Sequence, residues 1–280
     1  MGSVTPFLAI FTDLDGTLLD HDTYDWKAAK PALDQCRVME IPVNLVSSKT
    51  RGEIEHIRSA MVNSDPFISE NGGGIFFPDG GPEKVPNGTV FASGMWQWSL
   101  GQPYTFLVQS LHEIRQELGW NMRGFSDMTV REISHITGLD LETSRLASKR
   151  DYDEPFLLPD DGREYSLEFL RESASRRGLG ISVGGRFFHL HGQNNKGDAV
   201  RKLISWYKAN HASLLTAALG DSPNDYPMLQ VVDVPILVRS AEPSQERPLS
   251  LRNLRTTLDK GPEGWNRAIF DLLAELGLAA

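Results

Sequence analysis

The sequence predicts an α/β fold, a doubly wound and mostly parallel sheet with an inserted α+β domain. Short continuous apolar runs such as residues 7–11 suit strands that are buried on both faces, as in parallel sheets. These runs alternate with amphipathic helical stretches, a pattern typical of doubly wound sheets. The pattern stops near residue 85 and resumes near residue 191. We therefore expect a core formed by residues 1–84 and 191–280, and a cap formed by residues 85–190.

The first core segment alternates strands and helices. Thr50 and Glu53 have the spacing of a capping box, which predicts the start of a helix. The expected elements are, in order, a strand at 7–11, a helix at 26–39, a strand at 41–46, the capped helix, a strand at 67–68 and a hairpin through 79–81.

The cap and the second core segment show the same signals. Pro, Gly and Asn gather at residues 82–88, which predicts a linker. In the cap we expect a strand at 95–100, helices at 107–118 and 164–176, and a hairpin that joins 181–183 to 187–188. In the core we expect a helix opened by residues 195–198, strands at 214–219 and 235–238, a polar loop at 241–248 and a helix at 265–276.

The composition argues against several classes of partner. The chain of 280 residues has a formal net charge of −9, which disfavours nucleic acids and anionic membranes as partners. A small anionic substrate stays compatible, because a few basic residues can reverse the sign inside a cleft. Cys36 is the single cysteine, so no intrachain disulfide can form. With no signal-peptide pattern and no transmembrane-length apolar segment, we expect a cytoplasmic protein.

Four polar clusters follow expected core strands or begin a helix. They are Asp13 with Asp15, Ser47, Lys196, and Asp221 with Asn224 and Asp225. Ligands of open α/β sheets bind at the carboxyl ends of the strands, so these clusters can converge. Each cluster alone has an ordinary structural explanation, as a turn, a helix cap, a solvated helix residue or a loop residue. Their combination in this order is hard to explain structurally and indicates one site.

The residue types in the clusters suit phosphoryl transfer. A carboxylate can attack phosphorus to form an aspartyl phosphate. The oxygens of the transition state need neutralisation, for which the Lys196 ammonium and the Ser47 hydroxyl are available. Asp13 and Asp15 would repel each other unless a cation neutralises them. Oxygen ligands without a cluster of Cys or His favour Mg²⁺ over Zn²⁺.

These clusters resemble the motifs of the haloacid dehalogenase superfamily of phosphatases. Residues 11–18 (FTDLDGTL) resemble the first motif, Ser47 after NLV the second, Lys196 within NKGDA the third, and residues 220–225 (GDSPND) the fourth. The resemblance implies a Rossmannoid core of the haloacid dehalogenase type and a magnesium-dependent phosphatase. It also places the insert between the second and third motifs, where the larger α/β cap of the sugar-phosphatase branch lies.

The resemblance further implies a role for each residue. Asp13 would be the nucleophile, and Asp15 would protonate the leaving oxygen and then activate water. Ser47 and Lys196 would hold the phosphoryl group. The ligands of Mg²⁺ would be Asp13, the backbone carbonyl of Asp15 and Asp221, with support from Asn224 and Asp225. The dehalogenases and the transport ATPases lack a carboxylate at the position of Asp15, which disfavours both branches.

Within the superfamily, the sequence resembles the mannosyl-3-phosphoglycerate phosphatases. Four stretches carry the resemblance: residues 47–51 (SSKTR), 69–75 (SENGGGI), 147–156 (ASKRDYDEPF) and 184–189 (GGRFFH). They imply hydrolysis of mannosyl-3-phosphoglycerate, a small phosphoester, to mannosylglycerate and phosphate in a compatible-solute pathway. Glucosyl-3-phosphoglycerate or another phosphosugar is an alternative substrate. A phosphomutase and a non-catalytic sugar-phosphate sensor are further alternatives, although a sensor would be expected to lack Asp13 or Asp15.

Several residues in these stretches are candidates for binding the substrate. They are Ser48, Lys49, Gly72, Gly73, Gly74, Arg150, Arg186 and His189. Amides of consecutive glycines can approach an anion closely, and the arginines could bind a carboxylate or phosphate in fork geometry. Surface positions would explain the arginines and Lys49 equally well. His189 and His191 could contact sugar hydroxyls or hold a metal, and Trp96 and Trp98 could stack on a sugar or pack in the interior.

Overall fold

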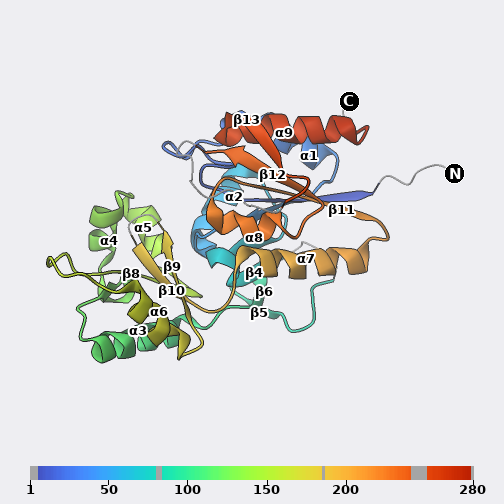
Figure 1. The fold of residues 1–280 in the computed structure, drawn as a ribbon. Helices are drawn as coiled ribbons and strands as arrows, with labels where there is room; N and C mark the ends of the chain where they lie inside the picture. The colour runs from blue at the N-terminus through green and yellow to red at the C-terminus, as the bar shows by residue number, and fades with distance from the viewer. Residues whose placement is uncertain (1–5, 80–83, 185–186, 241–250, 279–280) are drawn as a thin grey trace.

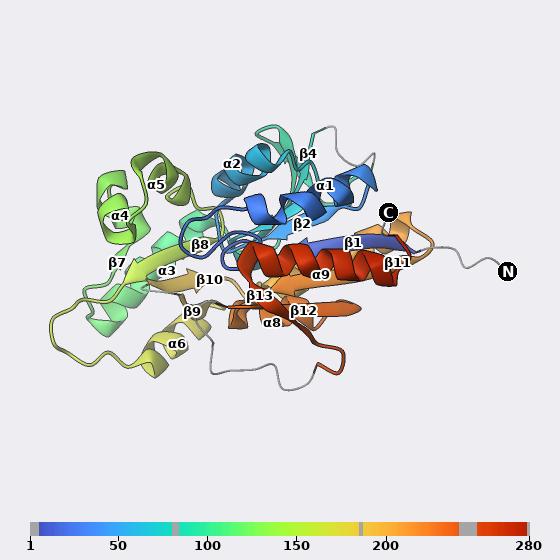
Figure 2. The ribbon, with the colours of Figure 1, turned by 90° about the horizontal axis from the view of Figure 1, so that it is seen from above.

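The computed structural model describes residues 6–79, 84–184, 187–240 and 251–278. It contains a nine-stranded sheet and a four-stranded sheet, which lie in two lobes (Figures 1 and 2). The predicted α/β fold class is confirmed. The predicted polar loop at 241–248, most of the predicted turn at 79–81, and Gly185 and Arg186 of the predicted cap hairpin lie outside the described residues.

The larger sheet has the strand order β13-β12-β11-β1-β2-β3-β4-β6-β5. The strands from β13 to β3 pair in parallel, whereas β4, β6 and β5 pair antiparallel. The strands are β1 (Phe7–Thr12), β2 (Val43–Val46), β3 (Phe67–Ser69), β4 (Gly74–Pro78), β5 (Val90–Ala92), β6 (Met95–Ser99), β11 (Leu214–Gly220), β12 (Val234–Arg239) and β13 (Arg255–Lys260). The carboxyl ends of the parallel strands therefore share one edge of the sheet.

Helices cover both faces of this sheet. Alternate side chains of each strand point to opposite faces, so both faces present apolar side chains to helices. Leu8 and Ile10 of β1 pack with one set of helices, and Ala9 and Phe11 pack with the other. The first set is α1 (Lys30–Val38), α2 (Arg51–Met61) and α9 (Gly261–Glu275), and the second is α7 (Lys196–Asn210) and α8 (Tyr226–Leu229). Within the described parts of the chain, no helix combines the length and apolarity needed to cross a bilayer.

The smaller sheet has the antiparallel order β7-β8-β10-β9. Leu111 and Leu170 from two of its helices pack against Phe156 on one face of the sheet. The strands are β7 (Arg123–Gly124), β8 (Asp153–Leu157), β9 (Gly180–Gly184) and β10 (Phe187–His191), and the helices are α3 (Tyr104–Leu118), α4 (Val130–Thr137), α5 (Leu141–Ala147) and α6 (Leu167–Ser175). Short 3₁₀ helices are η1 (Lys27–Ala29), η2 (Glu70–Gly72), η3 (Phe125–Asp127) and η4 (Pro223–Asp225).

The predicted start of the cap at residue 85 is wrong. The strand predicted at 95–100 is β6, which pairs with β4 in the larger sheet, and β5 extends the same antiparallel edge. Trp96 and Trp98 of β6 pack against the apolar cluster of the core, so packing explains these tryptophans. At the other end, β10 continues to His191. The sequence pattern identified a strand, but it could not show which sheet the strand joins.

Candidate active site

The three candidate groups that follow strands lie together at the carboxyl edge of the larger sheet. Asp13 directly follows β1, and its amide donates a hydrogen bond to the carbonyl of Leu219 in β11 at 2.9 Å. On its other side β1 pairs with β2, with Thr12 opposite Leu45. This register places Asp13 between the loop that begins with Ser47 and the loop that begins with Asp221.

Lys196, the remaining candidate, is the first residue of α7 and lies at the same place. Its ammonium donates hydrogen bonds to Asp13 Oδ1 at 2.5 Å and to Asp225 Oδ1 at 2.7 Å. The side chain is only 1% exposed, so these carboxylates replace the water that a lysine normally keeps. The predicted convergence of Asp13, Lys196 and the 221–225 loop is therefore observed.

The site carries more negative than positive charge. Burial opposes the charge of Lys196, but Asp13 and Asp225 raise its pKa above the usual value, which keeps the ammonium protonated. Burial and Asp225 raise the pKa of Asp13, while Lys196 acts to lower it. Burial and Asp225 also raise the pKa of Asp221 to about 6. A further cation would relieve this imbalance.

The carboxylates fit a divalent metal ion. Ligand oxygens of Asp13, Asp221 and Asp225 lie within 4.8 Å of one another. Asp225 is the least available of them, because its Oδ1 accepts from Lys196 and its Oδ2 accepts from the amides of Asp221 at 3.0 Å and Ser222 at 3.1 Å. The donor set therefore suits a hard divalent ion held by Asp13 and Asp221, with Asp225 in a supporting position.

Gly16 brings the Asp15 turn against Asp221. Its φ of +75° is in the left-handed region, and a Cβ at this position would lie 2.6 Å from Asp221 Oδ2. Thr17 then donates a hydrogen bond to Asp221 Oδ1 at 3.2 Å. The side chain of Asp15 is partly exposed, and its Oδ2 lies 2.9 Å from the ammonium of Lys49. Lys49 therefore points toward the predicted general acid rather than into solvent.

Ser47 lies at the end of β2, fully buried, in a loop that we call the Ser47 loop (residues 47–50). Its hydroxyl oxygen accepts a hydrogen bond from the amide of Lys49 at 3.1 Å, which leaves the hydroxyl proton for an anion. Its carbonyl accepts from the amide of Asn71 at 3.0 Å. Asn224, in contrast, is exposed, and its Oδ1 accepts from the Ser222 hydroxyl at 2.5 Å.

The glycines predicted to approach an anion have a packing reason in the structure. A Cβ on Gly72 would lie 2.2 Å from the carbonyl oxygen of Asn195, at the start of α7. A Cβ on Gly73 would lie 2.3 Å from Cβ of Tyr152, and one on Gly74 would lie 2.7 Å from the ring of the same tyrosine. These glycines make room for α7 and for the chain that enters β8.

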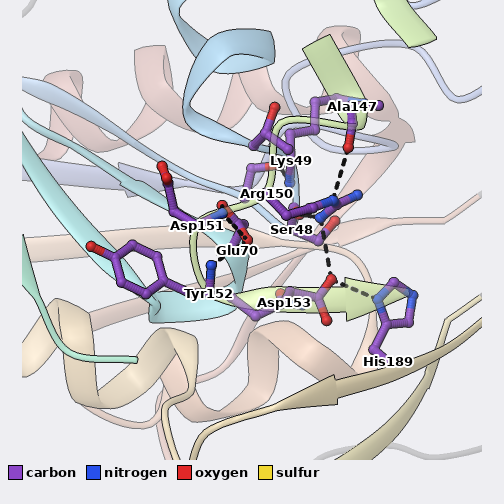
Figure 3. Close-up of polar contacts among 12 residues, drawn as sticks. Ser48, Lys49, Glu70, Ala147, Arg150, Asp151, Tyr152, Asp153 and His189 are labelled. Carbon is purple, nitrogen blue, oxygen red and sulfur yellow. Dashed lines mark hydrogen bonds and ion pairs between the residues drawn. The ribbon is translucent and has the colours of Figure 1, made fainter. Parts of the chain in front are cut away.

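The predicted cap ligands are bound to other parts of the protein. Arg150 donates hydrogen bonds to the carbonyls of Ala147 and Ser48 and to the carboxylate of Asp153 (Figure 3). His189 Nδ1 lies 2.8 Å from the same carboxylate. The structure thus gives Arg150 and His189 protein partners close to Ser48. Arg186 lies outside the described residues.

A cavity of about 360 Å³ opens beside Lys49, between the core and the cap. The ammonium of Lys49 also lies 5.0 Å above the centre of the Tyr24 ring. The cavity is lined by residues from the loop after β1, from α2 and from the α4–α5 region, namely Leu19, Tyr24, Trp26, Lys49, Glu53, His56, Ile57, Ala60, Leu139, Asp140, Thr143 and Leu146. It therefore reaches the Lys49–Asp15 pair from the side of the cap.

Glu70 is a buried acid whose contacts could not be predicted from the sequence. It is 1% exposed, and its carboxylate accepts hydrogen bonds from the amides of Asp151 at 3.0 Å and Tyr152 at 2.8 Å. Its φ of +47° is rare for a residue with a side chain. Glu70 lies in one of the stretches that carry the family resemblance, but no local pattern shows that its partners lie at the entry to β8.

Comparisons with known proteins agree with this geometry. A family model described as haloacid dehalogenase-like hydrolase matches residues 10–83 and 182–246. A glucosyl-3-phosphoglycerate/mannosyl-3-phosphoglycerate phosphatase from Methanococcoides burtonii is 41% identical over 95% of this chain and 97% of its own. A protein of the same name from Persephonella marina is 37% identical over 96% and 98%. A solved phosphatase structure from Bacteroides thetaiotaomicron, 16% identical, covers 99% of this chain and 97% of its own with a TM-score of 0.66, which supports the fold.

Glu70 should make stability depend on pH. Burial raises its pKa from 4.5 to about 8. Between these values the folded protein keeps a proton that the unfolded chain releases, so the free energy of unfolding should fall as pH rises through this window. Glu70→Gln should lack this dependence. We expect the difference between wild type and variant, measured by urea unfolding, to shift by more than about 1 kcal/mol in favour of the variant from pH 5 to pH 8. If the free energies of unfolding of wild type and variant change in parallel from pH 5 to pH 8, Glu70 is ionised throughout this range.

Proposed function

Because the chain belongs to the haloacid dehalogenase-like hydrolase family, we propose that it is a Mg²⁺-dependent phosphatase that converts mannosyl-3-phosphoglycerate to mannosylglycerate and phosphate. The observation that carries this proposal is the placement of Asp13, held by Lys196 and flanked by Asp15 and Asp221 at one sheet edge. The relatives from Methanococcoides burtonii and Persephonella marina are named for both glucosyl and mannosyl substrates, which favours glucosyl-3-phosphoglycerate as a second substrate.

Two carboxylates can carry out both steps of the hydrolysis. A carboxylate oxygen of Asp13 attacks phosphorus, and the bond from phosphorus to the glycerate oxygen breaks. Asp15 donates a proton to that departing oxygen. Asp15 then accepts a proton from a water molecule that attacks the phosphorus of the aspartyl phosphate. This second step releases inorganic phosphate and restores the Asp13 carboxylate.

Basic and hydroxyl groups stabilise the charge that develops on the phosphoryl oxygens. Lys196 is fixed by Asp13 and Asp225, so its ammonium needs no reorganisation during the reaction. The Ser47 hydroxyl can donate to a second oxygen, because its own acceptor site is already occupied by the amide of Lys49. Asp13, Asp221 and the carbonyl of Asp15 would hold Mg²⁺, which would supply further neutralisation of the phosphoryl oxygens.

The cavity beside Lys49 supports a leaving group larger than a simple alcohol. Its wall reaches Lys49, which pairs with the proposed acid Asp15 at 2.9 Å. Tyr24 and Trp26 offer aromatic surface to a sugar ring, and Thr143 offers a hydroxyl. A cavity of about 360 Å³ falls within the usual range for small-molecule sites. We therefore place the glycosyl part of the substrate in this cavity.

The proposed reaction is tested by phosphate release from a panel of esters. We expect release from mannosyl- and glucosyl-3-phosphoglycerate, loss of activity after chelation of divalent metal and recovery on addition of Mg²⁺. Simple sugar phosphates and 3-phosphoglycerate should be poorer substrates, because they leave most of the cavity unfilled. Ligand binding without any phosphate release would favour a sensor, and an isomerised ester with little free phosphate would favour a mutase.

The two catalytic carboxylates should be individually essential. Asp13→Asn removes the nucleophile and Asp15→Asn removes the proton donor, so each should lower kcat by more than about a thousandfold with saturating Mg²⁺. The control is Asp34→Asn, since Asp34 is a partly exposed residue of α1 that pairs with Lys30 and Arg37. A folded Asp13→Asn protein that keeps substantial turnover would end the assignment of Asp13 as nucleophile.

Filling the cavity should affect only the larger substrates. Thr143→Trp adds bulk to the wall contributed by α5, so it should lower kcat/KM for mannosyl-3-phosphoglycerate at least roughly tenfold. Turnover of p-nitrophenyl phosphate, which has no sugar, should change little. Arg145→Trp places the same bulk at an exposed position of the same helix, outside the cavity, and serves as the control. Equal effects of Thr143→Trp on both substrates would mean that the sugar binds elsewhere.

A further inference from the structure

The chain from the end of α5 to the start of β8 is fixed to the core at several points. The hydroxyl of Thr50, at the start of α2, donates to the carbonyl of Leu146 at 3.1 Å. Glu70 accepts the amides of Asp151 and Tyr152, as described above. Tyr152 is 4% exposed, packs in the apolar cluster of the core and shares a hydrogen bond of 2.7 Å with the Ser99 hydroxyl. This segment, residues 146–153, therefore connects the two lobes rigidly, and we call it the joint.

Arg150 lies at the centre of this joint (Figure 3). Its Nε donates to the carbonyl of Ala147 at 3.0 Å, and its Nη1 donates both to the carbonyl of Ser48 and to Asp153 Oδ2, each at 3.2 Å. The side chain is 9% exposed. Protein acceptors therefore occupy Nε and Nη1 of the guanidinium, and one of these acceptors belongs to the Ser47 loop.

Asp153 and His189 hold the guanidinium in place. Asp153 is buried on β8, and its Oδ2 is shared by Arg150 and by Nδ1 of His189, which lies on the adjacent strand β10. Burial acts to raise the pKa of Asp153, but His189 and Arg150 together lower it below the usual value, so the carboxylate stays charged. Arg150 is thus anchored to the cap sheet by a paired, buried anion.

The carbonyl that Arg150 binds belongs to the same peptide unit as the amide that orients Ser47. The carbonyl of Ser48 and the N–H of Lys49 share one rigid plane. Arg150 bonds the oxygen of this plane at 3.2 Å, and the N–H on its other side donates to the hydroxyl oxygen of Ser47 at 3.1 Å. A rotation of the plane would therefore break both bonds together.

From this arrangement we propose that Arg150 is a positioning residue for the Ser47 hydroxyl and does not itself bind the substrate. By fixing one peptide plane from the cap, Arg150 directs the hydroxyl proton of Ser47 toward the phosphoryl group. The inference rests on the proposed phosphatase function, in which Ser47 contacts that group. It replaces the expectation that Arg150 binds a carboxylate or phosphate of the substrate, and it makes the cap a part of the phosphoryl-binding geometry.

The first test compares substrates with and without a carboxylate. Arg150→Gln should lower kcat/KM by roughly ten- to a hundredfold, because a small misplacement of a binding group is costly. The loss should be equal for mannosyl-3-phosphoglycerate and p-nitrophenyl phosphate, since both carry the phosphoryl group. A loss confined to mannosyl-3-phosphoglycerate, and seen mainly in KM, would show that Arg150 binds the substrate carboxylate and would overturn the proposal.

The second test is a double-mutant cycle with Ser47. If Arg150 acts through the Ser47 hydroxyl, Arg150→Gln should have little further effect on turnover in a Ser47→Ala background. Full additivity of the two losses would contradict the proposal. If Arg150→Gln does not fold, Arg150→Lys decides in the same cycle, because lysine keeps the charge but cannot bond Ala147, Ser48 and Asp153 in the same geometry.

A buried arginine elsewhere provides the control for effects on folding alone. Arg58 of α2 is 5% exposed, donates to the carbonyl of Asp65 at 2.9 Å and lies above the Phe67 ring. Arg58→Gln should lower the melting temperature but leave kcat unchanged for both substrates. The cycle can be run on any phosphoester that the wild type hydrolyses. A wild type that acts on p-nitrophenyl phosphate but not on glycosyl phosphoglycerates would refute the proposed substrate and still test Arg150.

Discussion

One buried ammonium joins the two halves of the core. Lys196, at the start of α7, is shared by the Asp13 carboxylate after β1 and the Asp225 carboxylate after β11. Removing one member of a buried ionic group typically costs about 3–5 kcal/mol, because the remaining charge is left without a partner. The start of α7 and the ends of β1 and β11 must therefore meet at this point. The same ion pairs stabilise the fold and shape the candidate site.

The backbone segments around Lys196 approach one another closely. A Cβ on Gly220 would lie 2.4 Å from Cβ of Asp225, and one on Gly197 would lie 2.3 Å from the carbonyl of Pro227. On the other side of β1, the indole of Trp265 donates to the Thr12 hydroxyl at 3.0 Å, which in turn donates to the carbonyl of Asp13 at 2.8 Å. Asp13, the proposed nucleophile, is thus held by polar contacts from both faces of the sheet.

The sequence predicted the parts of the site that depend on local patterns. The strands before Asp13, Ser47 and Asp221 are nearly continuous apolar runs. Because ligands bind at the carboxyl ends of such strands, these residues were predicted to lie together. The capping box of α2 was predicted correctly, because Thr50 and Glu53 satisfy each other within one turn. Edge strand β13 was not predicted, because its sequence RTTLDK is polar and mostly exposed.

Contacts between distant segments could not be predicted in this way. Gly73 and Gly74 suggested an anion site, but the side chain that needs their space is Tyr152, far along the chain. Arg150 was likewise predicted to bind substrate. Its hydrogen bond to the carbonyl of Ser48 joins residues far apart in the sequence, so no local pattern shows it. Strand β6 was assigned to the cap, although it pairs in the larger sheet, because period and composition do not identify a pairing partner.

The proposed chemistry depends most on Asp13 carrying the phosphoryl group. The direct test is to mix enzyme with mannosyl-3-phosphoglycerate and Mg²⁺, quench within one turnover, and reduce the protein with borohydride, which converts an aspartyl phosphate to homoserine. Peptide mass spectrometry should find homoserine at position 13, only when substrate is present. Phosphate release without any reduction at Asp13, or with reduction at another aspartate, would contradict the assignment of Asp13 as nucleophile.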